Sequence, residues 1–181
     1  LPTAVALAVS TLVVAAGCAS DADVLSPRRA CPADPVRVVV TVDQWTDVVR
    51  GVGGDCVDVA TIISGSSGDP HDYEPTPRDV AGFERARLVV RNGLGYDSWA
   101  DRAVAGLDHP PAIVDAGDVV GLRPGANPHI WYSPTAVRRV AGAVVRRLGQ
   151  LLPATTAGYL RARRATWDGR LRAYDAAVAT T

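Results

Sequence analysis

Short runs rich in valine and isoleucine alternate with segments that carry apolar residues at helical spacing from residue 36 onward. A strand buried on both faces reads as a continuous β-branched run, and Val36–Val42 (VRVVVTV) is the clearest example. Thr76-Pro77 and Ser133-Pro134 each place a capping hydroxyl before a proline, which is typical of a helix start. The pattern predicts strands at 36–42, 57–63, 88–91 and 112–115, with helices at 44–52, 77–85, 96–107 and 134–151.

Strands that alternate with helices in this way form a parallel sheet with right-handed crossovers. We therefore expect an α/β, Rossmann-like lobe over residues 36–152. From Pro153 a single helical stripe runs almost to Thr181, so residues 153–181 are predicted to start a separate long helix. The apolar positions of this stripe are Leu160, Trp167, Leu171, Tyr174 and Val178.

The first 18 residues have the character of an export signal. Residues 4–16 are apolar apart from Ser10 and Thr11, which is too short for a membrane span and suits the apolar part of a signal peptide. Val-Ala-Ala-Gly-Cys at the end resembles a bacterial lipobox, so Cys18 is predicted to be lipidated. The alternative is an ordinary secretory signal with an incidental cysteine. Because the chain opens with Leu1, we expect its true start to precede it.

Residues 19–35 are polar, small and proline-bearing, which indicates a flexible tether between the anchor and the lobe. Export would place the two remaining cysteines, Cys31 and Cys56, in an oxidising compartment, where a disulfide is expected. Each precedes a predicted strand, at 36–42 and 57–63, and both strands of a β-α-β unit start at the same edge of the sheet. The spacing therefore predicts a Cys31–Cys56 bridge.

The charged residues exclude several classes of function. All 19 cations are arginine and balance 19 acidic residues, so the net charge is zero. A chain without lysine cannot form a phosphate-binding loop lysine, a kinase-type ATP lysine or a Schiff base. A neutral chain without a basic cluster also gives no support to nucleic acid as a partner.

Two loops carry a proline-histidine pair, and each loop leads into a predicted helix that begins with a proline. His71 follows the second predicted strand, and His129 follows the fourth. Ligands of open parallel sheets bind beyond the carboxyl ends of the strands, and imidazole is a common ligand of divalent transition metals. His71 and His129 are therefore candidate metal ligands, whereas a solvated or hydrogen-bonded histidine is the alternative for either one alone.

Three longer segments, in this order along the chain, also support the interpretation of a metal site. DPHDYEPTPRDV, ARLVVRNGLGYDSWADR and NPHIWYSP resemble the N-terminal half of the zinc/manganese solute-binding proteins of bacterial ABC transporters. In that family a long rigid helix joins two α/β lobes, and the metal is buried between them. The resemblance implies that His71 and His129 are the two ligands of the N-terminal lobe. Asn127 stands where the family commonly has an aspartate.

The resemblance also sets expectations for the whole protein. The helix after Pro153 would be the inter-lobe helix, and the second lobe, with the remaining ligands, is expected to be missing from this chain. The protein would be a monomer, lipid-anchored on the extracytoplasmic face, and would pass zinc or manganese to an ABC permease. A third histidine in the second lobe would favour zinc, and a carboxylate pair would favour manganese or iron.

Two other functions are alternatives to metal delivery. A metallohydrolase needs an open metal position and a general base, and no Ser-His-Asp set or H-E-x-x-H motif is present, so we expect no enzyme. A surface lipoprotein with a structural metal, such as an adhesin, remains the main alternative. His109 lies in a loop outside the three motifs and is interpreted as a solvated histidine.

Overall fold

The structure is a computed structural model that describes residues 30–65 and 68–178. Its centre is a sheet of four parallel strands in the order β2-β1-β3-β4. Val38 on β1 pairs with Val59 on one side and Leu88 on the other, so β1 is a central strand. The strands are β1 (Val36–Val42), β2 (Val57–Ile63), β3 (Leu88–Arg91) and β4 (Ala112–Asp115). All four predicted strands are confirmed.

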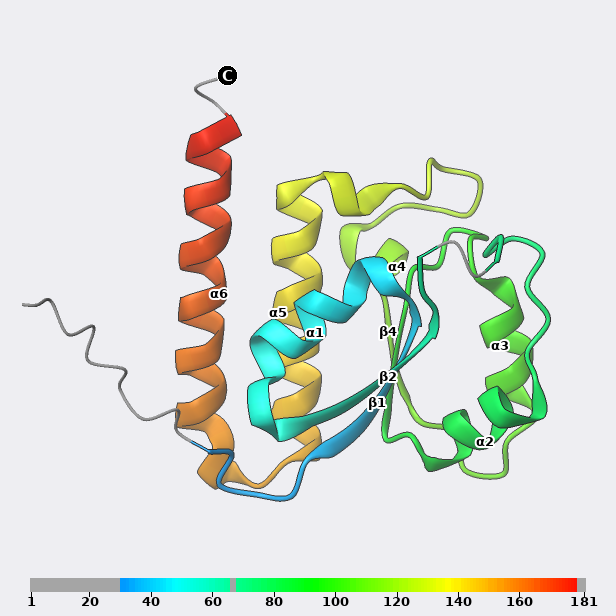
Figure 1. The fold of residues 1–181 in the computed structure, drawn as a ribbon, viewed down its shortest axis with the longest axis horizontal. Helices are drawn as coiled ribbons and strands as arrows, with labels where there is room; N and C mark the ends of the chain where they lie inside the picture. Colours follow the sequence, from blue (N-terminus) through cyan, green and yellow to red (C-terminus); the bar gives the residue numbers. More distant parts are fainter. Residues whose placement is uncertain (1–29, 66–67, 179–181) are drawn as a thin grey trace, which may run out of the picture.

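Helices cover both faces of the sheet, as the α/β prediction required (Figure 1). The helix α1 (Thr46–Gly53) packs with α5 (Pro134–Leu151) and α6 (Ala157–Val178) on one side. The opposite side carries α2 (Pro77–Arg85) and α3 (Ser98–Ala105). A short helix, α4 (Ala116–Val120), and 3-10 turns at 43–45, 54–56, 130–132 and 154–156 complete the described elements.

The two proline-capped helices begin where the sequence predicted. Thr76 accepts the backbone N–H of Asp79, and Asp79 accepts the backbone N–H of Thr76, so α2 opens with a capping box. Ser133 accepts the backbone N–H of Ala136 at the start of α5. The stripe of α5 that faces the core is fully buried at Val140, Ala141, Val144 and Leu148.

The third helix is shorter than the predicted 96–107. Asp97 is left out of it because its carboxylate turns back to accept the backbone N–H groups of Asn92 and Gly93. Its backbone, with φ of −132° and ψ of 43°, is therefore not helical. Tyr96 also lies before the helix, in the loop that follows β3.

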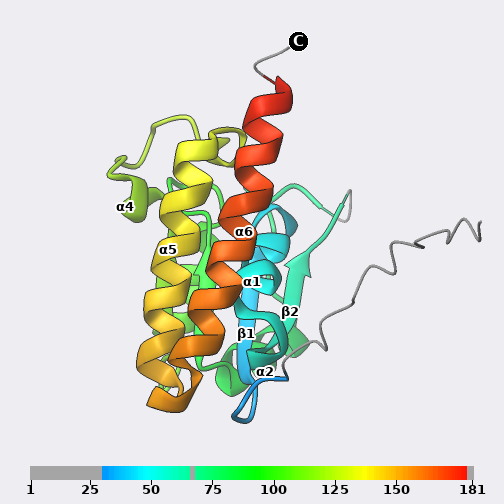
Figure 2. The same cartoon turned by 90° about the vertical axis from the view of Figure 1, so that its left-hand side faces the viewer.

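The last helix runs alongside α1 and α5 and continues beyond the start of α5 (Figures 1 and 2). Its first turns are buried, with Leu160 only 2% exposed, whereas Tyr174 and Val178 are 58% and 56% exposed. Arg164 donates to the backbone oxygen of Arg138 on α5 at 3.1 Å. The apolar stripe of α6 is therefore covered by the lobe only in its first half.

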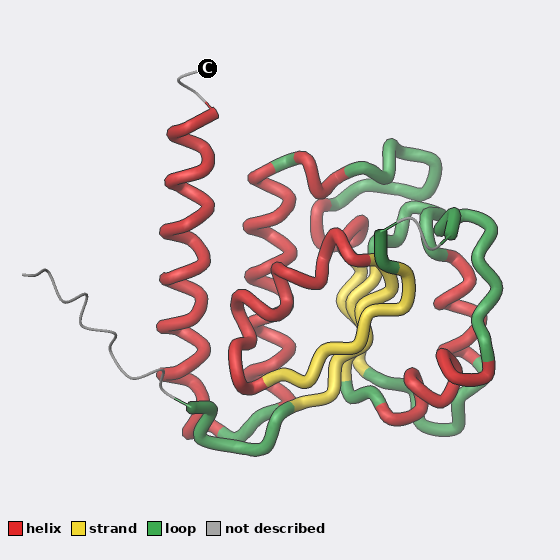
Figure 3. The backbone as a smooth tube through the Cα atoms, in the orientation of Figure 1, coloured by secondary structure: helices red, strands yellow, loops and turns green. Residues whose placement is uncertain are grey.

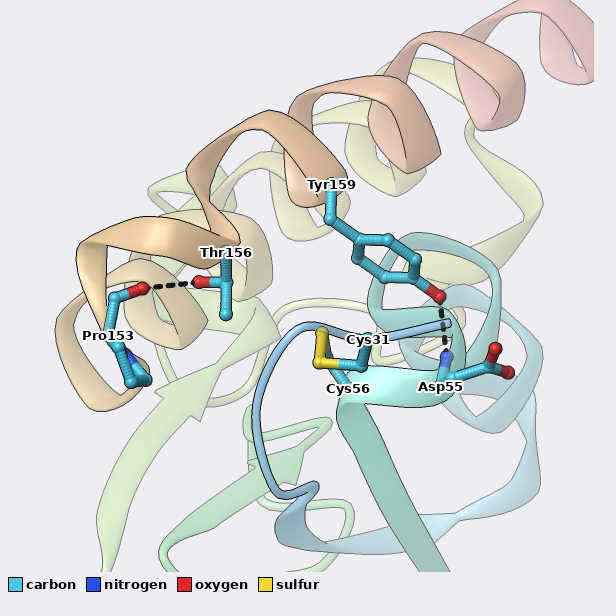
Figure 4. The surroundings of a disulfide bond; sticks show 6 residues. All are labelled: Cys31, Asp55, Cys56, Pro153, Thr156 and Tyr159. Atoms are coloured by element: carbon cyan, nitrogen blue, oxygen red, sulfur yellow. Dashed lines mark hydrogen bonds between the residues drawn. A yellow bond between two sulfur atoms is a disulfide. The ribbon is translucent and has the colours of Figure 1, made fainter. Parts of the chain in front are cut away.

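A disulfide joins Cys31 to Cys56 at the amino end of the sheet (Figure 4). Cys56 is fully buried, and the neighbouring Asp55 donates its backbone N–H to the hydroxyl of Tyr159 at 2.7 Å. The bridge and this hydrogen bond together tie the segment before β1 and the turn before β2 to α6. The predicted signal peptide, Cys18 and most of the predicted tether lie outside the described residues. In the described part of the chain, no helix has the length and apolarity needed to cross a membrane.

Candidate metal site

The two predicted ligand histidines lie in the connections that follow β2 and α4. Figure 3 shows loops, in green, gathered at the carboxyl end of the sheet. His71 belongs to the connection between β2 and α2, and His129 follows α4 and directly precedes the turn at 130–132. Both side chains are exposed. Both connections leave the carboxyl ends of strands, which is the end at which open parallel sheets bind their ligands.

Each histidine is held by the same local turn. The backbone N–H of His71 donates to the Asp69 carboxylate at 2.9 Å, and that of His129 donates to the Asn127 side-chain oxygen at 2.9 Å. In both cases a proline separates the acceptor from the histidine and fixes its φ angle. The repeated Asx-Pro-His turn therefore presents two imidazoles on stiff backbone.

The imidazole of His129 has one nitrogen engaged. Its Nδ1 lies 2.7 Å from the same Asn127 side-chain oxygen. The amide must present oxygen here because the backbone N–H of His129 can only donate, so Nδ1 carries the proton and Nε2 stays free to accept a metal. Asn127 therefore contacts both the backbone and the ring of His129.

One segment of the chain forms hydrogen bonds with both histidine loops. Asn92, directly after β3, donates from its side-chain nitrogen to the Pro128 carbonyl at 3.0 Å. Trp99 on α3 donates its indole N–H to the Pro70 carbonyl at 3.1 Å. Asn92 is fully buried and also accepts the indole N–H of Trp45 at 3.0 Å. The backbone on the amino side of each histidine is thus fixed to the β3–α3 segment.

Tyr96 lies between the two imidazoles. Its ring centroid is 4.9 Å from that of His71 and 6.1 Å from that of His129, with interplanar angles of 82° and 66°. Trp131 packs beside it, with ring centroids 5.4 Å from Tyr96 and 5.1 Å from His129. Tyr96 is only 8% exposed, so the two exposed histidines rest on a buried aromatic ring.

Asp97 holds the loop that carries Tyr96. It is fully buried and accepts hydrogen bonds from the Thr41 hydroxyl at 2.6 Å and from the backbone of Asn92 and Gly93 at 2.7 and 2.8 Å. The backbone is left-handed at Gly93, Leu94 and Gly95, with φ of 73°, 59° and 85°. Glycine tolerates this region, and the flanking glycines let the chain turn tightly enough to aim Tyr96 at the loops.

The pKa of Tyr96 is raised, first by burial and then by the negative charges of Asp69, Asp43 and Asp97. Its phenol therefore stays neutral at physiological pH. The pKa of Tyr73, in the His71 loop, is raised to about 12 by burial and by its hydrogen bond to Asp79. Both rings therefore act here as neutral packing groups, not as phenolates.

The comparisons with known proteins bear on this geometry. The family described as "Zinc-uptake complex component A periplasmic" matches residues 38–181, which include both histidine loops. The chain belongs to this family. Its members are non-enzymatic, metal-binding solute-binding proteins of ABC transporters, as the three motifs predicted.

Individual relatives agree with the assignment. The chain is 32% identical to the iron-binding protein YfeA of Yersinia pestis over 72% of its own length and 44% of that protein. It is 28% identical to the manganese-binding lipoprotein PsaA of Streptococcus pneumoniae, over 74% of this chain and 45% of PsaA. The chain thus spans about half the length of the curated relatives it matches.

Solved structures of the same family share the fold. The solute-binding protein FpvC of Pseudomonas aeruginosa, solved with Ni²⁺, is 30% identical with a TM-score of 0.70, over 81% of this chain and 54% of FpvC. A crystal structure of ZnuA is 28% identical with a TM-score of 0.67, over 77% of this chain and 55% of ZnuA.

Sequence analysis missed the residues that bring the loops together. The segment 92–95 turns tightly after β3, with left-handed backbone at Gly93, Leu94 and Gly95. Asn92, Tyr96 and Asp97 were given no role, although polar residues directly after a buried strand are a usable signal of a ligand site. His109 lies in the connection from α3 to β4, which is at the amino end of the sheet, away from both loops.

Proposed function

We propose that this protein captures a divalent transition metal outside the cytoplasm, zinc or manganese, and delivers it to an ABC permease. The observation that carries the proposal is the convergence of two Pro-His loops from different connections on the single ring of Tyr96. Family membership supports the transport role, and the named metals of the relatives, iron, manganese and nickel, support a divalent transition metal.

In this proposal His71 and His129 are ligands, and Nε2 of His129 faces the metal because Nδ1 is engaged by Asn127. No group of three histidine, cysteine or acidic side chains suited to a metal converges within residues 30–65 and 68–178. The two histidines would therefore supply part of the coordination shell, and the other donors come from elsewhere. Exposed ligands suit a cargo that must be taken up and released.

The same proposal includes attachment to the membrane through lipidated Cys18. We expect a monomer that the tether connects to its lipid anchor. Fractionation of cells that produce the wild type and Cys18→Ser tests this part: the variant should leave the membrane fraction. Retention of Cys18→Ser in the membrane fraction contradicts the lipid anchor.

Metal exchange distinguishes delivery from a structural metal. A delivery protein should bind Zn²⁺ or Mn²⁺ reversibly and stay folded, by circular dichroism, after the metal is removed by a chelator. Loss of fold on chelation would favour the alternative of a surface lipoprotein or adhesin with a structural metal. The hydrophobic core, which includes residues from all the strands and neither His71 nor His129, supports the first outcome.

A further inference from the structure

The two histidine loops share one support. Three residues of the β3–α3 segment reach them: Asn92 holds the Pro128 carbonyl, Trp99 holds the Pro70 carbonyl, and Tyr96 contacts both imidazoles. The separation of the histidines is therefore set by the spacing of these three residues along a single short segment. We call residues 92–99 the platform.

The platform is rigid because its polar groups are satisfied below the site. Asp97 accepts three hydrogen bonds in full burial, and the backbone N–H of Tyr96 donates to the Gly93 carbonyl at 3.0 Å. Buried, fully paired polar networks of this kind fix one conformation. Tyr96 consequently projects from a loop held by buried hydrogen bonds, while the imidazoles of His71 and His129 are exposed, and Asn127 holds Nδ1 of His129.

On the basis of the proposed function, we infer that Tyr96 is a positioning residue that sets the orientation of both imidazoles toward the metal. Edge-to-face packing restricts the plane of each histidine ring, and the interplanar angles of 82° and 66° to Tyr96 are of this type. A ring oriented before binding loses less conformational freedom when the metal arrives, so affinity rises. The packing face of Tyr96 carries this role, and its hydroxyl is not needed.

Two substitutions separate the ring from the hydroxyl. Tyr96→Leu removes the aromatic faces but keeps an apolar side chain, and Tyr96→Phe keeps the faces as the matched control. In the 181-residue chain, Tyr96→Leu should weaken Zn²⁺ binding by about tenfold, whereas Tyr96→Phe should stay within about twofold of the wild type. The thermal midpoint of the metal-free proteins, measured alongside, reports any general loss of stability.

The visible absorption of bound Co²⁺ gives a readout that a merely structural role would not change. Its intensity and shape depend on the number and geometry of the ligands. Tyr96→Leu should alter the Co²⁺ spectrum at saturation, and Tyr96→Phe should reproduce the wild-type spectrum. Should Tyr96→Leu fail to fold, Trp99→Phe tests the platform instead, because it removes the hydrogen bond to Pro70 and should likewise weaken binding and change the spectrum.

The variants His71→Ala and His129→Ala are titrated in the same series. If they abolish binding while Tyr96→Leu matches the wild type in affinity and Co²⁺ spectrum, the role of Tyr96 is overturned and the proposed function stands. An equal loss from Tyr96→Phe also overturns the inference, because the hydroxyl would then be the essential group. If neither histidine variant changes binding, the proposed site itself is wrong.

Discussion

Arg163 on α6 donates two hydrogen bonds to the backbone carbonyl of Gly51 on α1, from Nε at 3.1 Å and from Nη2 at 2.8 Å. This carbonyl lies in the last turn of α1, where the partial negative charge of the helix favours a cation. The indole of Trp167 covers the same residue, and a Cβ at Gly51 would lie 2.3 Å from its Cε3. Gly51 is therefore a point of close contact between α6 and the lobe.

The first prediction concerns this contact between Gly51 and α6. Gly51→Ala should lower the free energy of unfolding by about 1–3 kcal/mol, because the added methyl group forces Trp167 away from α1. Gly149→Ala is the matched control, since a Cβ there, on α5, meets nothing within 4 Å. The control should be neutral or stabilise by about 0.5–1 kcal/mol. Urea unfolding measures the free energy of unfolding of both variants. Equal values would contradict the close contact of Trp167 with Gly51.

A second prediction concerns Asn127, whose side-chain oxygen orients the imidazole of His129. Asn127→Ala should weaken Zn²⁺ binding by about 10–100-fold, because the ring loses the partner that fixes its proton on Nδ1. Asn127→Asp should retain binding, since a carboxylate oxygen accepts the same two hydrogen bonds. Isothermal titration compares the three proteins. Wild-type affinity in Asn127→Ala would show that the orientation of His129 does not depend on this contact.

Acid sensitivity of the His71 loop gives a third prediction. Burial alone would raise the pKa of Asp79, but hydrogen bonds from Thr76 and Tyr73 and the charge of Arg78 lower it overall from its usual 3.8. A carboxyl whose folded-state pKa is lowered stabilises the fold above its unfolded-state pKa, and this contribution disappears as the pH falls through the folded-state pKa.

Asp79→Asn should therefore cost about 1 kcal/mol at neutral pH, as the loss of a helix cap does, and should flatten the fall in stability below about pH 4. Asp72→Asn replaces an exposed carboxylate in the loop that precedes α2; it is the control and should change neither quantity. Thermal unfolding between pH 7 and the acid range tests this. An acid dependence in Asp79→Asn as steep as in the wild type would contradict it.

The disulfide supplies a fourth prediction. Cys31 and Cys56 are 25 residues apart, and closure of such a loop should stabilise the fold by roughly 3 kcal/mol by restricting the unfolded chain. Reduction, or a Cys31→Ser/Cys56→Ser double variant, should lower the free energy of unfolding by this amount. Thiol titration of the oxidised protein after denaturation should find no free thiol other than Cys18. Two additional thiols would contradict the bridge.

The elements that could be predicted are those whose signal is local. The run Val36–Val42 is largely apolar because β1 is a central strand of a sheet that helices cover on both faces, and Ser133-Pro134 starts α5 through contacts within one turn. The start of α3 could not be predicted, because Asp97 is recruited by Asn92 and Gly93 rather than by the helix. The convergence of both loops on Tyr96 likewise depends on contacts between residues 25 and 33 positions apart. Such contacts leave no periodic pattern in the sequence.

The central claim is that His71 and His129 together bind the metal, and titration calorimetry with Zn²⁺ and Mn²⁺ tests it most directly. Because no group of three suitable ligands converges in the described residues, the 181-residue chain should bind weakly, well short of nanomolar affinity. Since only neutral imidazole binds a metal, the affinity should fall further as the pH is lowered. His71→Ala and His129→Ala should each abolish binding, and His109→Ala, at the opposite end of the sheet, should leave it unchanged. Nanomolar binding by this chain, or an equal loss from His109→Ala, would contradict the account.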